Sequence, residues 1–238
     1  MTTALTDSYL DYSTATVADL ALHFPHAIPV LNKYNLDYCC NGKTPFLKAC
    51  ESSQLDAVEI WREVQQFGLV PASEHRLRFE NWEAGLLIDF ILQHHHSYVR
   101  EAIPTIQELV DKVCDVHGND SPHLLEVREV FQALAEELRQ HLPKEEEVLF
   151  PAIRKILEAQ SPDLTIQFVQ APMQVMEAEH DRAGELVKRL RQLTANYTAP
   201  AEACPTYQMT YTLLKEFDRD LIQHIHLENN LLFPKVKV

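Results

Sequence analysis

The chain has 238 residues, and its 46% hydrophobic share is ordinary for a globular protein with a sizeable core. Its net charge of −14, from 21 basic and 35 acidic residues, argues against a nucleic-acid or anionic-membrane partner. It has no signal-peptide pattern and no apolar run of about 18 residues, so we expect a soluble, intracellular protein. Five cysteines without framework spacing fit reduced thiols better than a disulfide scaffold.

Residues 1–73 predict a small helical domain. Thr16 and Asp19 have the spacing of a capping box, which predicts a helix starting there. Thr44 and Pro45 fit the N-cap and first position of another helix. The expected helices cover 16–24, 27–34, 44–50 and 56–67, and residues 68–73 form the expected linker.

Residues 74–238 predict four long helices, in which apolar residues recur at alternating spacings of three and four. Short loops join them, which implies an antiparallel arrangement. The predicted fold class is therefore all-α, a four-helix bundle preceded by the small helical domain. The expected helices cover about 81–116, 121–159, 161–196 and 206–238.

One stretch occurs twice in the bundle, at residues 141–151 and 224–234. Each copy has a histidine, a glutamate four residues later, and a Leu-Phe-Pro ending. Helical residues four apart lie on one face, about 5–6 Å apart at Cβ, so both side chains can reach one metal. Pro143 lies inside the first copy and predicts a kink there, whereas the second copy predicts an uninterrupted helix.

Each predicted helix has one apolar seam that contains a single histidine. In the run of three histidines, His96 lies on the strongest seam and His95 is the second choice. Two seams also carry a glutamate, and a buried ionised glutamate is costly unless it is paired or bound to metal. The candidate metal ligands are His96, His141, Glu145, His180, His224 and Glu228. After the glutamate of each copy, the next expected buried seam residue is Val148 in the first copy and Leu231 in the second.

Four imidazoles and two carboxylates are too many for one zinc ion, which takes three or four protein ligands. Two metals bridged by the two glutamates would each have two histidines and two carboxylate oxygens. An oxo or hydroxo bridge would complete five-coordination. These donors suit two iron ions, with Zn²⁺ or Cu²⁺ as substitutes.

These motifs resemble a hemerythrin-like domain, and from about Thr16 the chain resembles the repair of iron centres family. That family comprises bacterial di-iron proteins linked to iron–sulfur clusters damaged by nitrosative or oxidative stress. The resemblance implies iron on the same six residues and a cytoplasmic homodimer. It rests on Tyr38-Cys39-Cys40, Lys144-Glu145-Glu146, Glu179-His180-Asp181 and the stretch from His224 through Glu228-Asn229-Asn230 to Pro234. Asn41 replaces a family glycine, a mild change because asparagine also tolerates positive φ.

The adjacent Cys39 and Cys40 are the remaining candidate functional residues. Adjacent Cα atoms lie about 3.8 Å apart, below the usual ~4.4–6.8 Å across a disulfide, so a bond between them would be strained and readily reduced. The pair fits a redox relay, a thiolate stop for iron leaving the bundle, or two small buried residues without a role.

Three functions remain open from the sequence. The leading hypothesis is iron donation to damaged iron–sulfur proteins, with Cys39 and Cys40 taking part in transfer or redox control. The first alternative is an enzyme, a nitric oxide reductase at the di-iron site. The second is a hemerythrin-like sensor or carrier of O2 or NO, which gives the cysteine turn no evident role.

Overall fold

The computed structural model describes residues 11–68, 77–158 and 163–236, and it divides the chain into two compact units after Glu80. The described residues form helices and no strand, so the predicted all-α class is confirmed. The expected domain boundary after Ser73 and most of the expected linker lie outside the described residues. None of the described helices is both long and apolar enough to span a membrane.

The first unit contains four short helices, α1 (Val17–His23), α2 (Ile28–Lys33), α3 (Phe46–Ser52) and α4 (Ala57–Gly68). The predicted capping box is confirmed, because Asp19 N donates to Thr16 Oγ1 at 3.1 Å and Thr16 N donates to Asp19 Oδ2 at 2.9 Å. The prediction for Thr44 is wrong, since Pro45 is the N-cap of α3. Thr44 O accepts a hydrogen bond from Val17 N at 3.0 Å, and Thr44 N donates to Asn41 O at 2.9 Å, so the backbone of Thr44 closes the turn beside α1.

The turn that carries the two cysteines packs tightly on α1. A Cβ at Gly42 would lie 2.6 Å from Tyr38 O and 2.7 Å from the Ala18 side chain, so only glycine fits there. Asp37 closes the other side of the turn, because its Oδ1 accepts from Cys40 N at 2.9 Å and from Cys39 N at 3.2 Å. Side-chain capping of this kind fixes the backbone of the turn.

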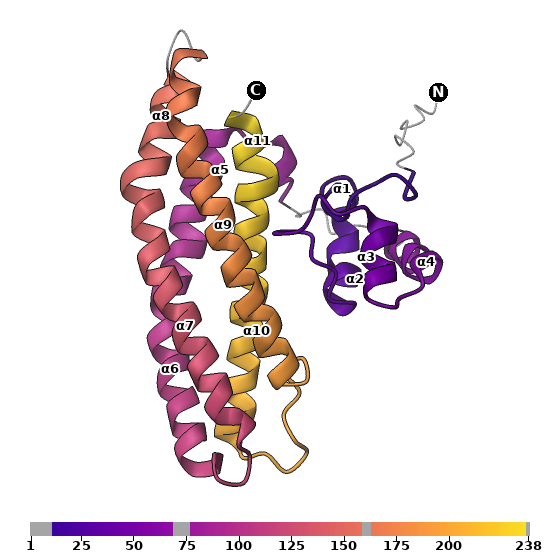
Figure 1. Cartoon of the computed structure of the whole chain (residues 1–238), viewed down its shortest axis with the longest axis vertical. Helices are drawn as coiled ribbons and strands as arrows, with labels where there is room; N and C mark the ends of the chain where they lie inside the picture. Colours follow the sequence, from indigo (N-terminus) through magenta and orange to yellow (C-terminus); the bar gives the residue numbers. More distant parts are fainter. Residues whose placement is uncertain (1–10, 69–76, 159–162, 237–238) are drawn as a thin grey trace. The chain divides into compact units, whose positions relative to one another are not determined.

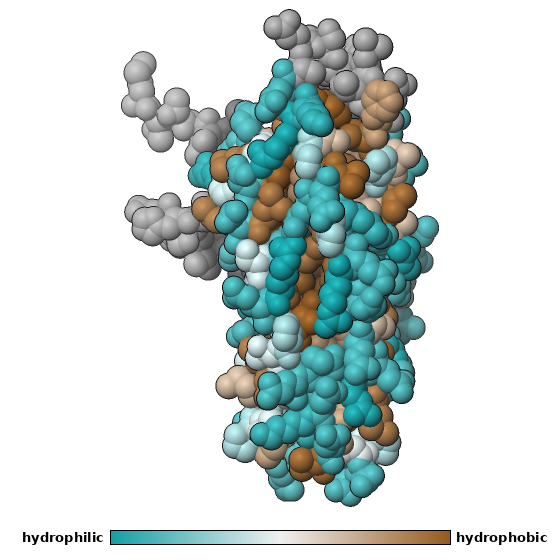
Figure 2. Space-filling model, turned by 90° about the vertical axis from the view of Figure 1, so that its left-hand side faces the viewer, coloured by the Kyte–Doolittle hydropathy of each residue, from teal (hydrophilic) through white to brown (hydrophobic). Residues whose placement is uncertain are grey.

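The second unit is a four-helix bundle, in which α7 packs against α6 and α9, and α10 packs against α6 (Figure 1). The buried Phe131 and Phe217 meet edge to face in its core, with ring centroids 5.7 Å apart. One face of the molecule is mostly covered by hydrophilic side chains, with a narrow hydrophobic strip along the bundle (Figure 2). The helices are α5 (Ala84–Phe90), α6 (Ser97–His117), α7 (His123–Lys144), α8 (Phe150–Glu158), α9 (Asp163–Leu193), α10 (Pro205–His226) and α11 (Phe233–Val236), and a 3-10 turn, η2 (Phe79–Asn81), precedes α5.

Three π-helical turns, η3 (Ile91–His96), η4 (Glu145–Leu149) and η5 (Leu227–Leu232), join successive helices without a break. A π turn holds one residue more than an α turn, so the buried face shifts by one residue after it. This shift makes the prediction of Val148 as a seam residue wrong, because Val148 is 59% exposed and Leu149 is buried. The second copy of the repeated stretch is therefore not the uninterrupted helix that we expected, since both copies contain a π turn.

Candidate metal centre

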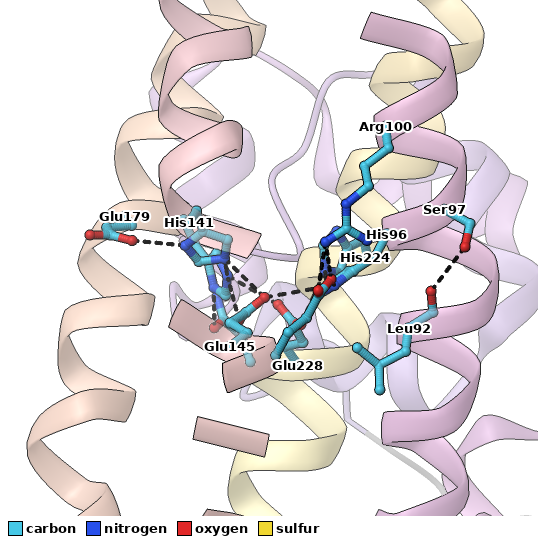
Figure 3. A network of polar contacts seen from close by, with 12 residues as sticks. Leu92, His96, Ser97, Arg100, His141, Glu145, Glu179, His224 and Glu228 are labelled. Atoms are coloured by element: carbon cyan, nitrogen blue, oxygen red, sulfur yellow. Dashed lines mark hydrogen bonds and ion pairs between the residues drawn. The ribbon is translucent and has the colours of Figure 1, made fainter. Parts of the chain in front are cut away.

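The bundle brings all six predicted ligands together as buried side chains at the level of the π turns. Figure 3 shows His96, His141, Glu145, His224 and Glu228 among them. They form two groups of possible metal ligands, and donor atoms within each group lie within 4.8 Å of one another. The first group contains His96 and His224, and the second contains His141 and His180. Both groups also contain the same two glutamates, Glu145 and Glu228.

The repeated His-x-x-x-Glu stretches have nearly the same local geometry. His141 Nε2 lies 3.2 Å from Glu145 Oε2, and His224 Nε2 lies 3.0 Å from Glu228 Oε1. Pro143 lies within α7 and leaves the spacing of the first pair close to that of the second. Each glutamate also faces the other helices, since Glu145 Oε2 lies 3.4 Å from His96 Nε2. Glu228 Oε2 lies 3.0 Å from His180 Nε2, so both carboxylates lie between the two histidine pairs.

Three of the histidines have their outer ring nitrogen fixed by an acceptor. His96 Nδ1 lies 2.6 Å from Glu146 Oε1, His141 Nδ1 lies 2.8 Å from Glu179 Oε2, and His180 Nδ1 lies 2.8 Å from Asn229 Oδ1. An ionised carboxylate only accepts, so Nδ1 of the first two rings carries the proton and Nε2 of the neutral ring presents a lone pair. Such outer acceptors orient metal-bound histidines in known sites.

The inner ring nitrogens of each histidine pair face each other. His96 Nε2 lies 3.2 Å from His224 Nε2, and His141 Nε2 lies 3.1 Å from His180 Nε2. Two lone pairs at this distance repel unless a proton or a cation lies between them. Both oxygens of Glu145 and Oε2 of Glu228 are also buried without a hydrogen bond among the described residues. The donor set therefore fits a pair of cations.

The pKa values show how strongly the two carboxylates need positive charge beside them. Burial raises the pKa of Glu145 and the charge of Glu228 raises it further, but His141 and His96 outweigh both and leave it below its ordinary value. The pKa of Glu228 lies well below its ordinary value, because His224 and His180 outweigh its burial. Burial lowers the pKa of His141, yet the glutamates and above all Glu145 raise it to about 9. The imidazoles beside the two carboxylates thus favour the ionised form of both.

We did not predict the roles of Glu146, Glu179 and Asn229 from the sequence. Adjacency was the available signal, because Glu146 and Asn229 directly follow the two inner glutamates and Glu179 directly precedes His180. The alternation of helix faces argued against them, since neighbours along a helix point in different directions. In the bundle, each reaches a histidine on a different helix.

Replacing Glu146 with glutamine should lower metal affinity about 10–100-fold, because it removes the negative charge behind His96 Nδ1. The same substitution at the exposed neighbour Glu147 is the matched control. Competition against a chelator of known affinity measures both variants. Equal affinities of Glu146→Gln and Glu147→Gln would contradict a supporting role for Glu146.

The two predicted functional cysteines lie in the first unit, with Cys39 Sγ 3.4 Å from Cys40 Sγ, too far apart for a disulfide bond. The hydrogen bond to Cys40 raises the pKa of the Cys39 thiol well above its ordinary value, and burial adds to the shift. Cys40 is partly exposed, so it is the more accessible thiol. Together with Asp37, the two thiols form a third group whose donor atoms lie within 4.8 Å of one another.

The fold and the paired histidine–glutamate groups define a hemerythrin-like metal-binding bundle. Consistent with this, a family model described as the hemerythrin HHE cation binding domain matches residues 87–236, and one described as a Domain of Unknown function (DUF542) matches residues 13–67. An "Iron-sulfur cluster repair protein YtfE" from Yersinia pseudotuberculosis serotype IB (strain PB1/+) is 36% identical over 229 residues, which covers 95% of this chain and 98% of that protein. The protein of the same name from Yersinia pestis (strain Pestoides F) has the same identity and coverage. The chain therefore belongs to the repair of iron centres family, as its motifs predicted.

Proposed function

We propose that this protein repairs iron–sulfur clusters damaged by nitrosative or oxidative stress, and that it does so by donating iron held in the bundle. The observation that carries the proposal is the pair of ligand groups that share Glu145 and Glu228. The relatives named as iron–sulfur cluster repair proteins support the same function, since they match along nearly the whole chain.

In this proposal the bundle holds two iron ions, bridged by the two glutamates and by an oxo or hydroxo group, and zinc can substitute for iron. Bound iron supplies both the cargo and a redox-active centre. The chain's own residues hold that cargo in an exchangeable form, because neutral imidazole and carboxylate are borderline and hard donors rather than thiolates. Glu146 and Glu179 keep Nδ1 of His96 and His141 protonated, so that Nε2 faces the cargo.

The cysteine turn is proposed to receive iron for transfer. A thiol must lose its proton to bind metal, and the raised pKa of Cys39 keeps that thiol protonated near neutral pH. A cation held first by the more accessible Cys40 and by Asp37 would favour the Cys39 thiolate. The turn would then bind iron only when iron is delivered to it.

The test is cluster repair by the pure protein after anaerobic iron loading, with an acceptor enzyme that carries a damaged [4Fe–4S] cluster. We expect recovery of acceptor activity and loss of iron from the bundle in proportion. Failure of the loaded protein to restore the cluster would contradict iron donation.

Replacing Cys40 with serine should slow the transfer about tenfold without changing the iron content of the bundle, because it removes the accessible thiol. Cys204→Ser is the matched control, since Cys204 is partly exposed and lies outside the turn. The initial rate of acceptor recovery measures both variants. Equal rates for the two variants would exclude a transfer role for the turn.

A second candidate function, nitric oxide reduction, is favoured by a small cavity beside the centre. It has a volume of about 10 Å³ and is lined by residues that include His141, His180 and His224. A space of this size holds about one water-sized ligand. This function predicts nitrous oxide over many turnovers from protein, an external reductant and nitric oxide. A single turnover or less would count against it.

The same proposal includes the setting that the family resemblance implies. The protein would act in the cytoplasm as a homodimer, with damaged iron–sulfur proteins as acceptors. The net charge of −14 supports the absence of a nucleic-acid or anionic-membrane partner. Sedimentation of the iron-loaded protein tests the dimer.

A further inference from the structure

A separate cluster of possible metal ligands lies beside the centre and consists of His94, His95 and Asp220. The two histidines belong to η3, and Asp220 lies on α10, one turn before His224. Asp220 Oδ1 lies 2.9 Å from His95 Nδ1 and 4.0 Å from His94 Nε2. Two ligands with bonds of about 2.1 Å to one ion are separated by roughly 3–4.2 Å, so these distances suit a shared cation.

The cluster leaves buried polar atoms without partners. His95 is fully buried, and its Nε2 makes no hydrogen bond among the described residues. Oδ2 of Asp220 is also buried and unpaired there. No lysine or arginine in the described part of the chain forms an ion pair with Asp220, whose ionic partners are the two histidines. The described residues therefore place no permanently charged cation beside this carboxylate, and a bound metal ion would supply one.

The cluster also connects solvent to the centre. The side chain of His94 is 58% exposed, that of Asp220 is 15% exposed, and that of His95 is inaccessible. The ring of His95 stacks on the ring of His224 at 5.4 Å between centroids and 4° between planes. Because His224 belongs to the first ligand group, the donors form a continuous series from the surface to the centre.

We propose that His94, His95 and Asp220 form an accessory site for a divalent transition-metal cation, which iron occupies on its way into or out of the bundle. The identity of the ion as iron rests on the proposed function. Two imidazoles and one carboxylate are a set that holds Fe²⁺ and leaves positions open for water. A neutral His95 would offer Nδ1 to the cation and carry its single ring proton on Nε2. Three protein ligands and open positions make an exchangeable site, as transit requires.

Titration of the iron-loaded protein with Co²⁺ under anaerobic conditions tests the site. We expect one additional Co²⁺ per chain whose affinity is at least tenfold weaker in His94→Ala and in Asp220→Asn. His23→Ala and Asp115→Asn are matched controls, because both replace exposed residues outside the cluster and should bind Co²⁺ like the wild type. No additional Co²⁺ in the wild type, or unchanged binding in both cluster variants, would overturn the proposal.

The same titration in the Glu145→Ala background separates this proposal from the proposed function. There the site should still bind one Co²⁺, since its ligands do not include Glu145. If the wild-type bundle holds no iron but the cluster binds Co²⁺, the proposed function fails and the accessory site stands. The transit role has its own readout, the rate at which an external chelator removes iron, which should fall about fivefold in His94→Ala. An unchanged rate would overturn transit.

Discussion

Replacing Glu145 with alanine is expected to empty the whole metal centre, whereas replacing His224 with alanine should remove only one of two ions. The reason is the arrangement of the ligand groups, because Glu145 belongs to both and His224 belongs to one. Glu145 is also the group that raises the pKa of His141 most, so its loss removes the negative charge that the imidazoles of both groups face. We expect at least a 100-fold loss of affinity for both ions, a larger effect than for an outer acceptor.

Metal content per chain after anaerobic reconstitution and Mössbauer spectra measure these outcomes. The expected values are about two irons in the wild type, about one in His224→Ala and none in Glu145→Ala, by the donor sharing described above. Glu147→Ala is the control, since Glu147 is exposed and lies two residues after Glu145 in the sequence. A Glu145→Ala protein that retains a paired-iron signal would show that the glutamate is not shared. Equal iron loss in His224→Ala would show that the two groups do not bind independently.

Removing the metal should lower the free energy of unfolding of the bundle by about 4 kcal/mol at a free metal concentration of about 1,000 times Kd. A domain of this size shifts its Tm by roughly 2–4 °C per kcal/mol, so a chelator should lower the Tm by about 8–16 °C. The physical cause is the burial of Glu145 and Glu228, whose carboxylates would lose the cations that compensate their charge.

Tryptophan fluorescence can follow the bundle selectively, because the chain has two tryptophans and only Trp82 lies in the second unit. Thermal unfolding of the Trp61→Phe protein, with and without chelator, therefore reports on the bundle. In the Glu145→Ala background the chelator should have no effect on Tm. A Tm of the metal-loaded protein that does not respond to chelator would contradict metal-dependent stability.

The apolar periodicity of the helices was sufficient to choose six residues that the bundle brings together. His96 was distinguished from His95 because its row of neighbours is more apolar, and the structure places His96 in the first ligand group. Periodicity could not show the role of Glu146, since its contact with His96 depends on how two helices face each other. Periodicity also gave a wrong prediction at Val148, because the apolar pattern does not reveal the extra residue that a π turn inserts into the helix.

The cysteine turn shows a different limit. The structure shows why Gly42 is needed there, since a Cβ at this position would clash with Tyr38 and Ala18. The sequence pattern does not show that Tyr38 and Ala18 lie this close to Gly42. Likewise, Thr44 is a favourable N-cap residue, but its backbone is bound to Val17 N and Pro45 takes the N-cap position instead. Local propensity was overruled by a partner that is distant in sequence.

The extra residue in each of the three π turns affects the position of the candidate ligands more than the packing of the core. A π turn is an α-helix with a single-residue insertion, and the apolar faces on either side stay aligned with the bundle core. Deleting one residue within 145–149 would therefore restore a regular helix without disturbing the packing of Phe131 below or Phe150 above. His96, Glu145 and Glu228 each lie in one of these π turns. The inserted residues are therefore the part of the backbone that serves ligand placement rather than core packing.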